Sequence, residues 1–307
     1  MTAVSADTGR TSQAAAAIRH HYDVGNAFYS LWLDRSLTYS CAMPAGDDDT
    51  LEAAQERKIR FHLDAIGAGQ ATSVLDIGCG WGAVLARLAE THRVARAVGL
   101  TLSDEQAAYV RDRGYPGVEV RTDNWLDYEP AAPFDGIISI GAFEHFATPA
   151  DPPAEKVRLY REFFRRCHGW LNQGGVLSLQ TIAYANMSRD DASAFMQREI
   201  FPNADLPTLA EITAAAEGVF EVRSVSNGRL DYAWTCERWA RRLRSRRDEA
   251  AGLVGPETVA RYERYLKLSA LGFRMGKICL LRIVLRPYDQ RYFAGSGDRR
   301  YFAGPGE

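Results

Sequence analysis

The sequence has little that would direct the protein to a membrane or to nucleic acid. None of its apolar runs reaches the ~18 residues that a transmembrane helix needs, and Met1–Arg10 lacks the apolar core of a signal peptide. The 37 basic and 39 acidic residues leave a net charge of −2, which argues against a nucleic-acid-binding protein. We therefore expect a cytoplasmic protein whose partners include no nucleic acid and that has no integral membrane association.

Cysteine is also sparse, and its spacing excludes two kinds of site. The five cysteines are scattered, their number is odd and no CxxC pair occurs. This pattern indicates neither a zinc site nor a disulfide framework, so we expect reduced thiols and no bound metal. Arginines gather between Arg238 and Arg247, which predicts a solvated helix face or, as the alternative, a peripheral contact with phosphate head groups.

The order of short apolar runs and helical patterns indicates one α/β domain over residues 14–286. Runs of both kinds alternate, as in a parallel, doubly wound sheet. We expect four segments in this domain: an N-terminal helical cap (14–66), a core (67–183), a mostly helical lid insertion (184–215) and a final part of core and lid (216–286). Residues 1–13 are small and polar, so we expect disorder there. The tail, 287–307, holds a nine-residue tandem repeat, interpreted as a flexible tail or, alternatively, as the contact of a homo-oligomer.

Local patterns place the individual elements. Apolar runs predict strands at 74–77, 97–100, 118–120, 136–140, 176–182, 220–222 and 278–285. Helical patterns cover 14–33, 83–90, 155–170, 237–250 and 257–271. A further helix is expected to begin at Asp49, which forms a capping box with Glu52, another is expected to be N-capped by Ser103, and a turn is expected at 172–175.

The strongest local signal is the segment Val74–Gly82, in which an apolar strand runs into three glycines at alternate positions and a helix follows. Glycines let a ligand approach the backbone, and the helix N-terminus offers free N–H groups. Asp76, at the strand end, can accept hydrogen bonds that fix the loop. The spacing is not the dinucleotide GxGxxG, no acid ends the second strand and no P-loop lysine follows. The LDxGCGxG form favours S-adenosylmethionine (SAM); the structural alternative is tight packing of strand and helix.

Several further motifs carry a resemblance: His21–Asp34, Leu37–Ala42, Leu75–Gly82, Gly99–Ser103 with Gln106, Ser139–Phe146, Ile200–Pro207, Tyr232–Trp239 and Phe273–Gly276. With these motifs the chain resembles the cyclopropane fatty acid synthases and mycolic acid methyltransferases from about His20 to Arg286. The resemblance implies the class I SAM-dependent methyltransferase fold, a Rossmann-like doubly wound sheet with N-terminal helices and a mostly helical lid.

The resemblance also implies the ligands of the cofactor, with S-adenosyl-L-homocysteine (SAH) as its product. These contacts fall on Tyr39, Ser40, Gly78, Gly80, Thr101, Leu102, Gln106, Trp125 and Ile140, to which we add Asp76. A bicarbonate ion acts as base in the family, held at positions that correspond to Cys41, Glu144, Tyr232, the backbone near Ile140 and one histidine. Gln180 stands at the histidine position. Because glutamine carries no charge and no titratable nitrogen, we expect the anion to bind weakly or not at all.

The chemistry sets further requirements. An alkene is a weak nucleophile, so the site must press it against the methyl group of SAM and shield the resulting carbocation with aromatic faces. Candidates for those faces in the substrate pocket are Tyr22, Phe143, Phe146 and Tyr184. Glu144 follows a strand end, where it can take a proton, hold an anion or orient Tyr232. The alternatives are a helix-capping carboxylate for Glu144, an ordinary aromatic for Tyr232 and a small buried hydrophobe for Cys41.

Together these features predict a SAM-dependent C-methyltransferase that acts on an electron-rich C=C of a hydrophobic small molecule or lipid. Because Gln180 replaces the histidine, we favour an isoprenoid-bearing or other small lipophilic acceptor. The first alternative is a cyclopropane synthase acting on unsaturated fatty acyl chains, and the second is a SAM-binding protein without catalysis.

Overall fold

The computed structural model describes residues 24–188 and 205–288. The expected disorder at 1–13, the candidate Tyr22, the middle of the lid insertion (189–204) and nearly all of the repeat-bearing tail (289–307) lie outside the described residues. Within the described part, no helix combines the length and apolar character needed to span a bilayer. The same part contains no group of three or more His, Cys, Asp or Glu side chains arranged to hold a metal ion.

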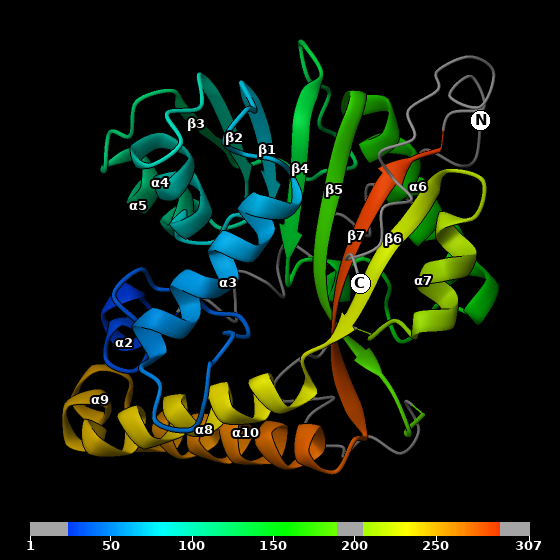
Figure 1. Ribbon diagram of the computed structural model, residues 1–307. Helices are drawn as coiled ribbons and strands as arrows, with labels where there is room; N and C mark the ends of the chain where they lie inside the picture. The colour runs from blue at the N-terminus through cyan, green and yellow to red at the C-terminus, as the bar shows by residue number, and fades with distance from the viewer. Residues whose placement is uncertain (1–23, 189–204, 289–307) are drawn as a thin grey trace, which may run out of the picture.

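Seven strands form one sheet in the order β3-β2-β1-β4-β5-β7-β6. In the upper part of Figure 1 the sheet extends from β3 on the left to β6 on the right. The strands are β1 (Ser73–Ile77), β2 (Arg96–Leu100), β3 (Val118–Arg121), β4 (Phe134–Ile140), β5 (Leu171–Tyr184), β6 (Phe220–Asn227) and β7 (Ile278–Pro287). Strands β1 to β5 pair in parallel. The strand positions and the Rossmann-like architecture predicted from the sequence are thereby confirmed.

The sheet is mixed, however, and differs in one strand from the parallel sheet that the alternating pattern predicted. Strand β7 runs antiparallel to both of its neighbours, β5 and β6. The reason is the short link after the preceding helix, which ends at Arg274. The link delivers Ile278 beside Tyr184, the last residue of β5. From that edge the chain can only run back along β5.

Helices cover both faces of the sheet because its strands alternate their apolar side chains. Leu75 and Ile77 of β1 pack in a core with α6 (Pro153–Trp170) and α7 (Leu209–Ala216). Val74, which precedes Leu75 on the strand, faces the opposite core, which α3 (Leu51–Ala65), α4 (Ala83–Glu90) and α5 (Asp104–Arg111) complete. This alternation follows from the two-residue period of a strand. Because the helices cover the faces of the sheet, the carboxyl ends of β1, β2 and β4 stay free to form a site.

A second layer of helices lies below the sheet in Figure 1, where α8 (Arg229–Ser245) and α10 (Pro256–Arg274) run side by side, with α2 (Asn26–Ser30) and α9 (Arg247–Val254) at one end. An aromatic core joins α2 to this layer. The Trp32 and Trp239 rings lie 5.8 Å apart, and the Tyr29 and Tyr262 hydroxyls are 3.0 Å apart. The N-terminal segment is thus held over the site by burial of large aromatic surfaces.

Three local predictions were corrected by the structure. The N-cap of α3 is Thr50, not Asp49, because the Thr50 hydroxyl accepts from the Ala53 N–H while Asp49 binds Arg57. The turn expected at 172–175 is part of β5, where the pairing with β4 shifts register, so the extra residues form an irregularity within the strand. Of the helix expected over 14–33, residues 14–23 lie outside the described residues, and the remainder forms the short α2 followed by a turn. The Ser103 cap of α5 is confirmed, since its hydroxyl accepts from the Gln106 N–H.

Three of the arginines between 238 and 247 form ion pairs within the fold. Arg242 binds Glu52 at 2.7 Å, Arg246 binds Glu249 and Arg247 approaches Glu263. These pairs compensate part of the charge, and the exposure of Arg241, Arg244 and Arg246 agrees with the prediction of a solvated helix face. A contact with head groups stays a prediction.

Candidate active site

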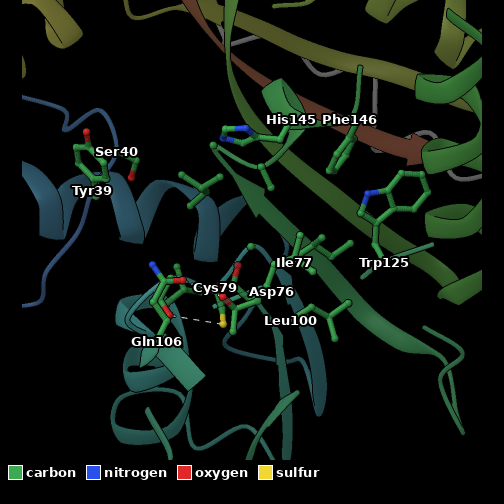
Figure 2. Close-up of a pocket in the computed structure, with 18 of the residues that line it drawn as sticks. Tyr39, Ser40, Asp76, Ile77, Cys79, Leu100, Gln106, Trp125, His145 and Phe146 are labelled. Atoms are coloured by element: carbon green, nitrogen blue, oxygen red, sulfur yellow. Dashed lines mark hydrogen bonds between the residues drawn. The ribbon is translucent and has the colours of Figure 1, made fainter. Parts of the chain in front are cut away.

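A cavity lies at the carboxyl ends of β1, β2 and β4, the edge at which open α/β sheets bind ligands. Its lining includes all the residues that the resemblance implied for the cofactor, together with Asp76: Tyr39, Ser40, Asp76, Gly78, Gly80, Thr101, Leu102, Gln106, Trp125 and Ile140. Figure 2 shows Tyr39 and Ser40 on one side, Asp76, Cys79 and Gln106 below, and Trp125 and Phe146 opposite. Segments distant in sequence thus meet around one space.

The glycine loop brings backbone, not side chains, to the floor of this cavity. Gly78 has φ +82° and Gly80 has φ +53°, in the left-handed region that favours glycine. A Cβ at Gly78 would lie 2.6 Å from the Cβ of Ala142, so this position is closed to any other residue without movement. The Gly78 and Cys79 N–H groups both donate to the Leu100 carbonyl, which ties the loop to β2.

The carboxyl end of β2 supplies polar groups to the same cavity. The Thr101 hydroxyl donates to Gln106 Oε1 at 2.8 Å and accepts from the Ser103 N–H. Both Thr101 and Gln106 are buried. These hydrogen bonds tie the start of α5 to the end of β2, and no acidic residue stands at that strand end. The geometry agrees with the sequence argument against a dinucleotide, whose ribose needs that acid.

Glu144 lies in the short 3-10 helix η1 (Phe143–His145), just beyond β4. Its Oε1 accepts a hydrogen bond from the Ile182 N–H at 2.6 Å, whereas Oε2 is buried without a partner among the described residues. Burial raises the pKa of this carboxyl to about 7, against the lowering effect of the Ile182 N–H. Glu144 is therefore poised to exchange a proton near neutral pH.

The other predicted catalytic residues lie behind the cavity wall. Cys41, Gln180 and Tyr232 are buried and are not part of the lining. The Tyr232 ring stacks on Phe273 at 4.5 Å, and its electrostatic environment includes both Cys41 and Glu144. Burial raises the pKa of the Cys41 thiol to about 12, so it is a neutral thiol and not a nucleophile. Cys41 comes from the loop before α3, Gln180 from β5 and Tyr232 from α8.

A buried guanidinium that the sequence argument missed completes this cluster. Arg282 of β7 is 2% exposed; it donates from Nε to Gln180 Oε1 at 2.9 Å and binds Asp231 at 3.0 Å. Its Nη2 lies 3.4 Å from Cys41 Sγ. The signal in the sequence was a lone charge inside an apolar strand. Because β7 lies between two other strands, that charge is buried and must be paired.

The aromatic residues predicted for the substrate pocket lie in different positions relative to the cavity. Phe146 lines the cavity and packs against Trp125 at 4.9 Å. Phe143 is fully buried and stacks on Tyr160, so it supports the wall from behind. The Tyr184 hydroxyl donates to Asp205, away from the cofactor cavity. His145 also lines the cavity, and burial lowers its pKa to about 4, so it is neutral near pH 7.

Comparison with known proteins agrees with this geometry. The family model described as mycolic acid cyclopropane synthetase matches residues 9–283. A probable fatty acid methyltransferase of Pseudomonas putida is 34% identical over 89% of this chain and 70% of its own length. Cyclopropane mycolic acid synthase 2 of Mycobacterium bovis is 35% identical over 82% of this chain and 87% of its own.

Solved structures of similar proteins agree with these sequence matches. The cyclopropane synthase MmaA2 of Mycobacterium tuberculosis has a TM-score of 0.79 and 33% identity, covering 89% of this chain and 98% of its own. The mycolic acid cyclopropane synthase CmaA1, complexed with SAH and CTAB, has the same TM-score and coverage at 32% identity. Coclaurine N-methyltransferase, at 21% identity and a TM-score of 0.72, shares the fold. The glycine loop, the cavity and these relatives together show that the chain is a SAM-dependent methyltransferase and belongs to the mycolic acid cyclopropane synthetase family.

Proposed function

We propose that the protein transfers the methyl carbon of SAM to the double bond of an unsaturated fatty acyl chain and closes a cyclopropane ring. The observation that carries this proposal is Glu144, whose buried Oε2 has no partner among the described residues and whose carboxyl has a pKa of about 7. Its neighbours Ala142 and His145 line the cofactor cavity. Ring closure requires a base that is sheltered from water, and this oxygen meets that requirement.

The names of the relatives support the acceptor class that we propose. One is named a probable fatty acid methyltransferase and others cyclopropane mycolic acid synthases. These names support the acyl-chain alternative over the isoprenoid-bearing acceptor that we favoured from the sequence. A geranyl diphosphate C-methyltransferase resembles the chain at only 16% identity, which speaks for a shared fold and not for a shared substrate. The relatives are also enzymes, which removes support from a non-catalytic SAM-binding role.

The proposed reaction balances in electrons and protons. SAM, when bound, supplies an electrophilic methyl group and leaves as SAH with the S–C electron pair. The alkene π pair forms the first C–C bond, which leaves a cation on the neighbouring carbon. The C–H pair of the transferred methyl then closes the ring, and the proton goes to Glu144 Oε2. Ionised Glu144 is the active form of such a base, and it dominates above a pH of about 7.

The bicarbonate ion implied by the resemblance fits this cluster poorly. Gln180 lacks the titratable nitrogen of histidine, and its Oε1 already accepts from Arg282. Arg282 in turn is held by Asp231 and the Ala42 carbonyl. We therefore route no proton through bicarbonate and assign the base to Glu144 itself.

The second candidate function is methyl transfer without ring closure, and Gln180 is the observation that favours it. If no base reaches the new methyl group, the cation loses a proton from a neighbouring carbon instead. The product would then carry an intact methyl branch. This outcome keeps the same cofactor and the same acceptor class.

Labelled SAM separates the two candidates. The purified protein is incubated with trideuteromethyl SAM and vesicles of monounsaturated phospholipid, with saturated phospholipid as control, and the released fatty acids are analysed by mass spectrometry and NMR. We expect a product that gains CD₂ and shows cyclopropane protons. Retention of all three deuteriums would establish the methyl-branched product. If no unsaturated phospholipid gives a labelled fatty acid, while a parallel incubation with an isoprenoid lipid gives a labelled product, the acyl-chain proposal is overturned.

A further inference from the structure

The buried guanidinium of Arg282 is bound by groups from three different parts of the fold. Arg282 stands opposite Gln180 in the pairing of β7 with β5, and its Nε donates to Gln180 Oε1 at 2.9 Å. Nη1 donates to Asp231 Oδ2, in the first turn of α8, at 3.0 Å. Nη2 donates to the Ala42 carbonyl at 2.9 Å. All three nitrogens therefore donate, and one charge joins β5, α8 and the segment before α3.

Two of these contacts belong to a closed ring of hydrogen bonds. The Ala42 N–H donates to Thr235 Oγ1 at 3.1 Å, and the Thr235 hydroxyl donates to the Asp231 carbonyl at 2.7 Å. The Asp231 carboxylate binds Arg282, which returns to the Ala42 carbonyl. The ring holds Ala42 against α8 by both its N–H and its carbonyl, so a shift between the two segments breaks polar contacts that burial makes costly to lose.

The ring connects the segment that lines the cofactor cavity with the helix that carries Tyr232. Tyr39 and Ser40 belong to the cavity lining, whereas Tyr232 lies in α8, directly after Asp231. The Trp239 ring lies 5.3 Å from the Tyr39 ring and 6.0 Å from the Tyr232 ring, so the two segments also meet through aromatic packing. Methyl transfer is sensitive to displacements of about 1 Å between the groups that position the reactants.

Gly228, the residue before α8, makes room for this network. Its φ of −94° is accessible to other residues, so no left-handed conformation requires a glycine there. A Cβ at this position would overlap Arg282 Nη1 and lie 3.0 Å from Asp231 Oδ2. Substitution of Gly228 therefore disturbs the ion pair without removing any polar group.

We propose that Arg282 is a positioning residue for methyl transfer: by joining Ala42 to Asp231, it fixes Tyr232 relative to the segment that lines the cofactor cavity. Arg282 lies outside the cavity lining and acts through these two segments. The inference rests on the methyl transfer of the proposed function, but neither on the acceptor nor on ring closure, so its failure and that of the acyl-chain proposal are distinguishable.

The first variant is Arg282→Met, which keeps a long side chain and removes the hydrogen bonds of the guanidinium. Calorimetry with SAH counts the folded sites and measures their affinity. Turnover of labelled SAM is then expressed per SAH-binding site, with vesicles of monounsaturated phospholipid or, if the wild type labels only that, of the isoprenoid lipid. We expect turnover per site to fall by roughly 10–100-fold. SAH affinity is expected to stay within about threefold, because Gln55 still donates to the Thr38 and Ser40 carbonyls.

Gly228→Ala is the second variant, and Gly252→Ala is its matched control. Gly228→Ala is expected to lower turnover per site in the same direction by a smaller factor, because the added methyl group displaces Arg282 from Asp231. Gly252 lies in α9 with no atom within 4 Å of an added Cβ, so Gly252→Ala should leave turnover unchanged. Unchanged turnover per site in Arg282→Met, or an SAH affinity that falls as strongly as turnover, would overturn the proposal. If Arg282→Met does not fold, Gly228→Ala decides, because unchanged turnover per site there contradicts the same network.

Discussion

Glu144 presents two unlike oxygens to its surroundings. Oε1 is held by the Ile182 N–H, so the side chain has one fixed direction, and Oε2 has no partner among the described residues. A carboxylate that is both oriented and incompletely satisfied costs stability, which proteins commonly tolerate where the group has a chemical task. Glu144 therefore differs in chemical role from Cys41, whose raised pKa keeps it a neutral thiol.

For Glu144→Gln we expect kcat to fall by roughly two orders of magnitude or more, because the variant cannot accept a proton. SAM affinity is expected to stay within about twofold, since Glu144 lies outside the cofactor cavity lining. The wild-type rate should rise with pH through about 7, as the carboxyl ionises, and the residual rate of the variant should not. Steady-state kinetics over this pH range measure both effects.

Glu119→Gln serves as the control, because Glu119 is an exposed carboxylate on β3. A Glu144→Gln enzyme with activity within about twofold of wild type would assign Glu144 a structural role.

At the scale of elements, the loop between β1 and α4 decides how closely a ligand approaches the backbone. Its glycines are not equivalent. Gly78 is limited both by its positive φ and by Ala142, which follows β4, whereas the space beside the Gly80 Cα is open. The loop thus depends on the position of a neighbouring strand end, and not only on its own conformation.

We expect Gly78→Ala to be the more damaging of two matched substitutions. Gly80→Ala should cost about 1–2 kcal/mol, the penalty of a left-handed conformation for alanine. Gly78→Ala adds a contact at 2.6 Å with Ala142, which only a shift of the segment before η1 relieves, so both stability and SAH affinity should fall further. Urea denaturation and calorimetry of the two variants provide the measurement, and equal losses would show that the contact with Ala142 has no effect.

At the scale of the whole molecule, the ligand-free protein carries an internal electrostatic penalty. Asp76 and Glu144 both have pKa values raised by burial to about 7. Groups of this kind favour the folded state at low pH, and that contribution is lost as pH rises from the unfolded pKa to the folded one. His62 and His145, whose pKa values are lowered, act in the opposite sense over an overlapping range. Only a difference between variants isolates one group.

Asp76→Asn is accordingly expected to stabilise the ligand-free protein, and to do so in a pH-dependent way. The gain should be negligible below pH 3.8, grow as pH rises toward about 7 and then stay level. Its upper value is about 4 kcal/mol, from the rise in the pKa of Asp76 from 3.8 to about 7. Denaturant unfolding at pH 5 and pH 8, without ligand, measures it. A gain that is equal at both pH values would contradict a buried, ionised Asp76.

The sequence by itself determined the elements of the core and the identity of the cofactor. The segment Val74–Gly82 has an apolar strand, alternating glycines and a helix start, and each of these is a local property that one stretch of chain reveals. For the same reason the strand positions and the Ser103 cap were predictable.

Only the tertiary structure decided which charges are buried and what they meet. Lys58 reads as one more polar residue of an amphipathic helix, and the sequence cannot tell that this face of α3 packs on the cavity. Arg282 pairs with Gln180 because β7 is antiparallel and lies between β5 and β6, a pairing that depends on long-range register. The pKa values of Glu144 and Asp76 likewise arise from desolvation, which is a property of the assembled interior and of no segment alone.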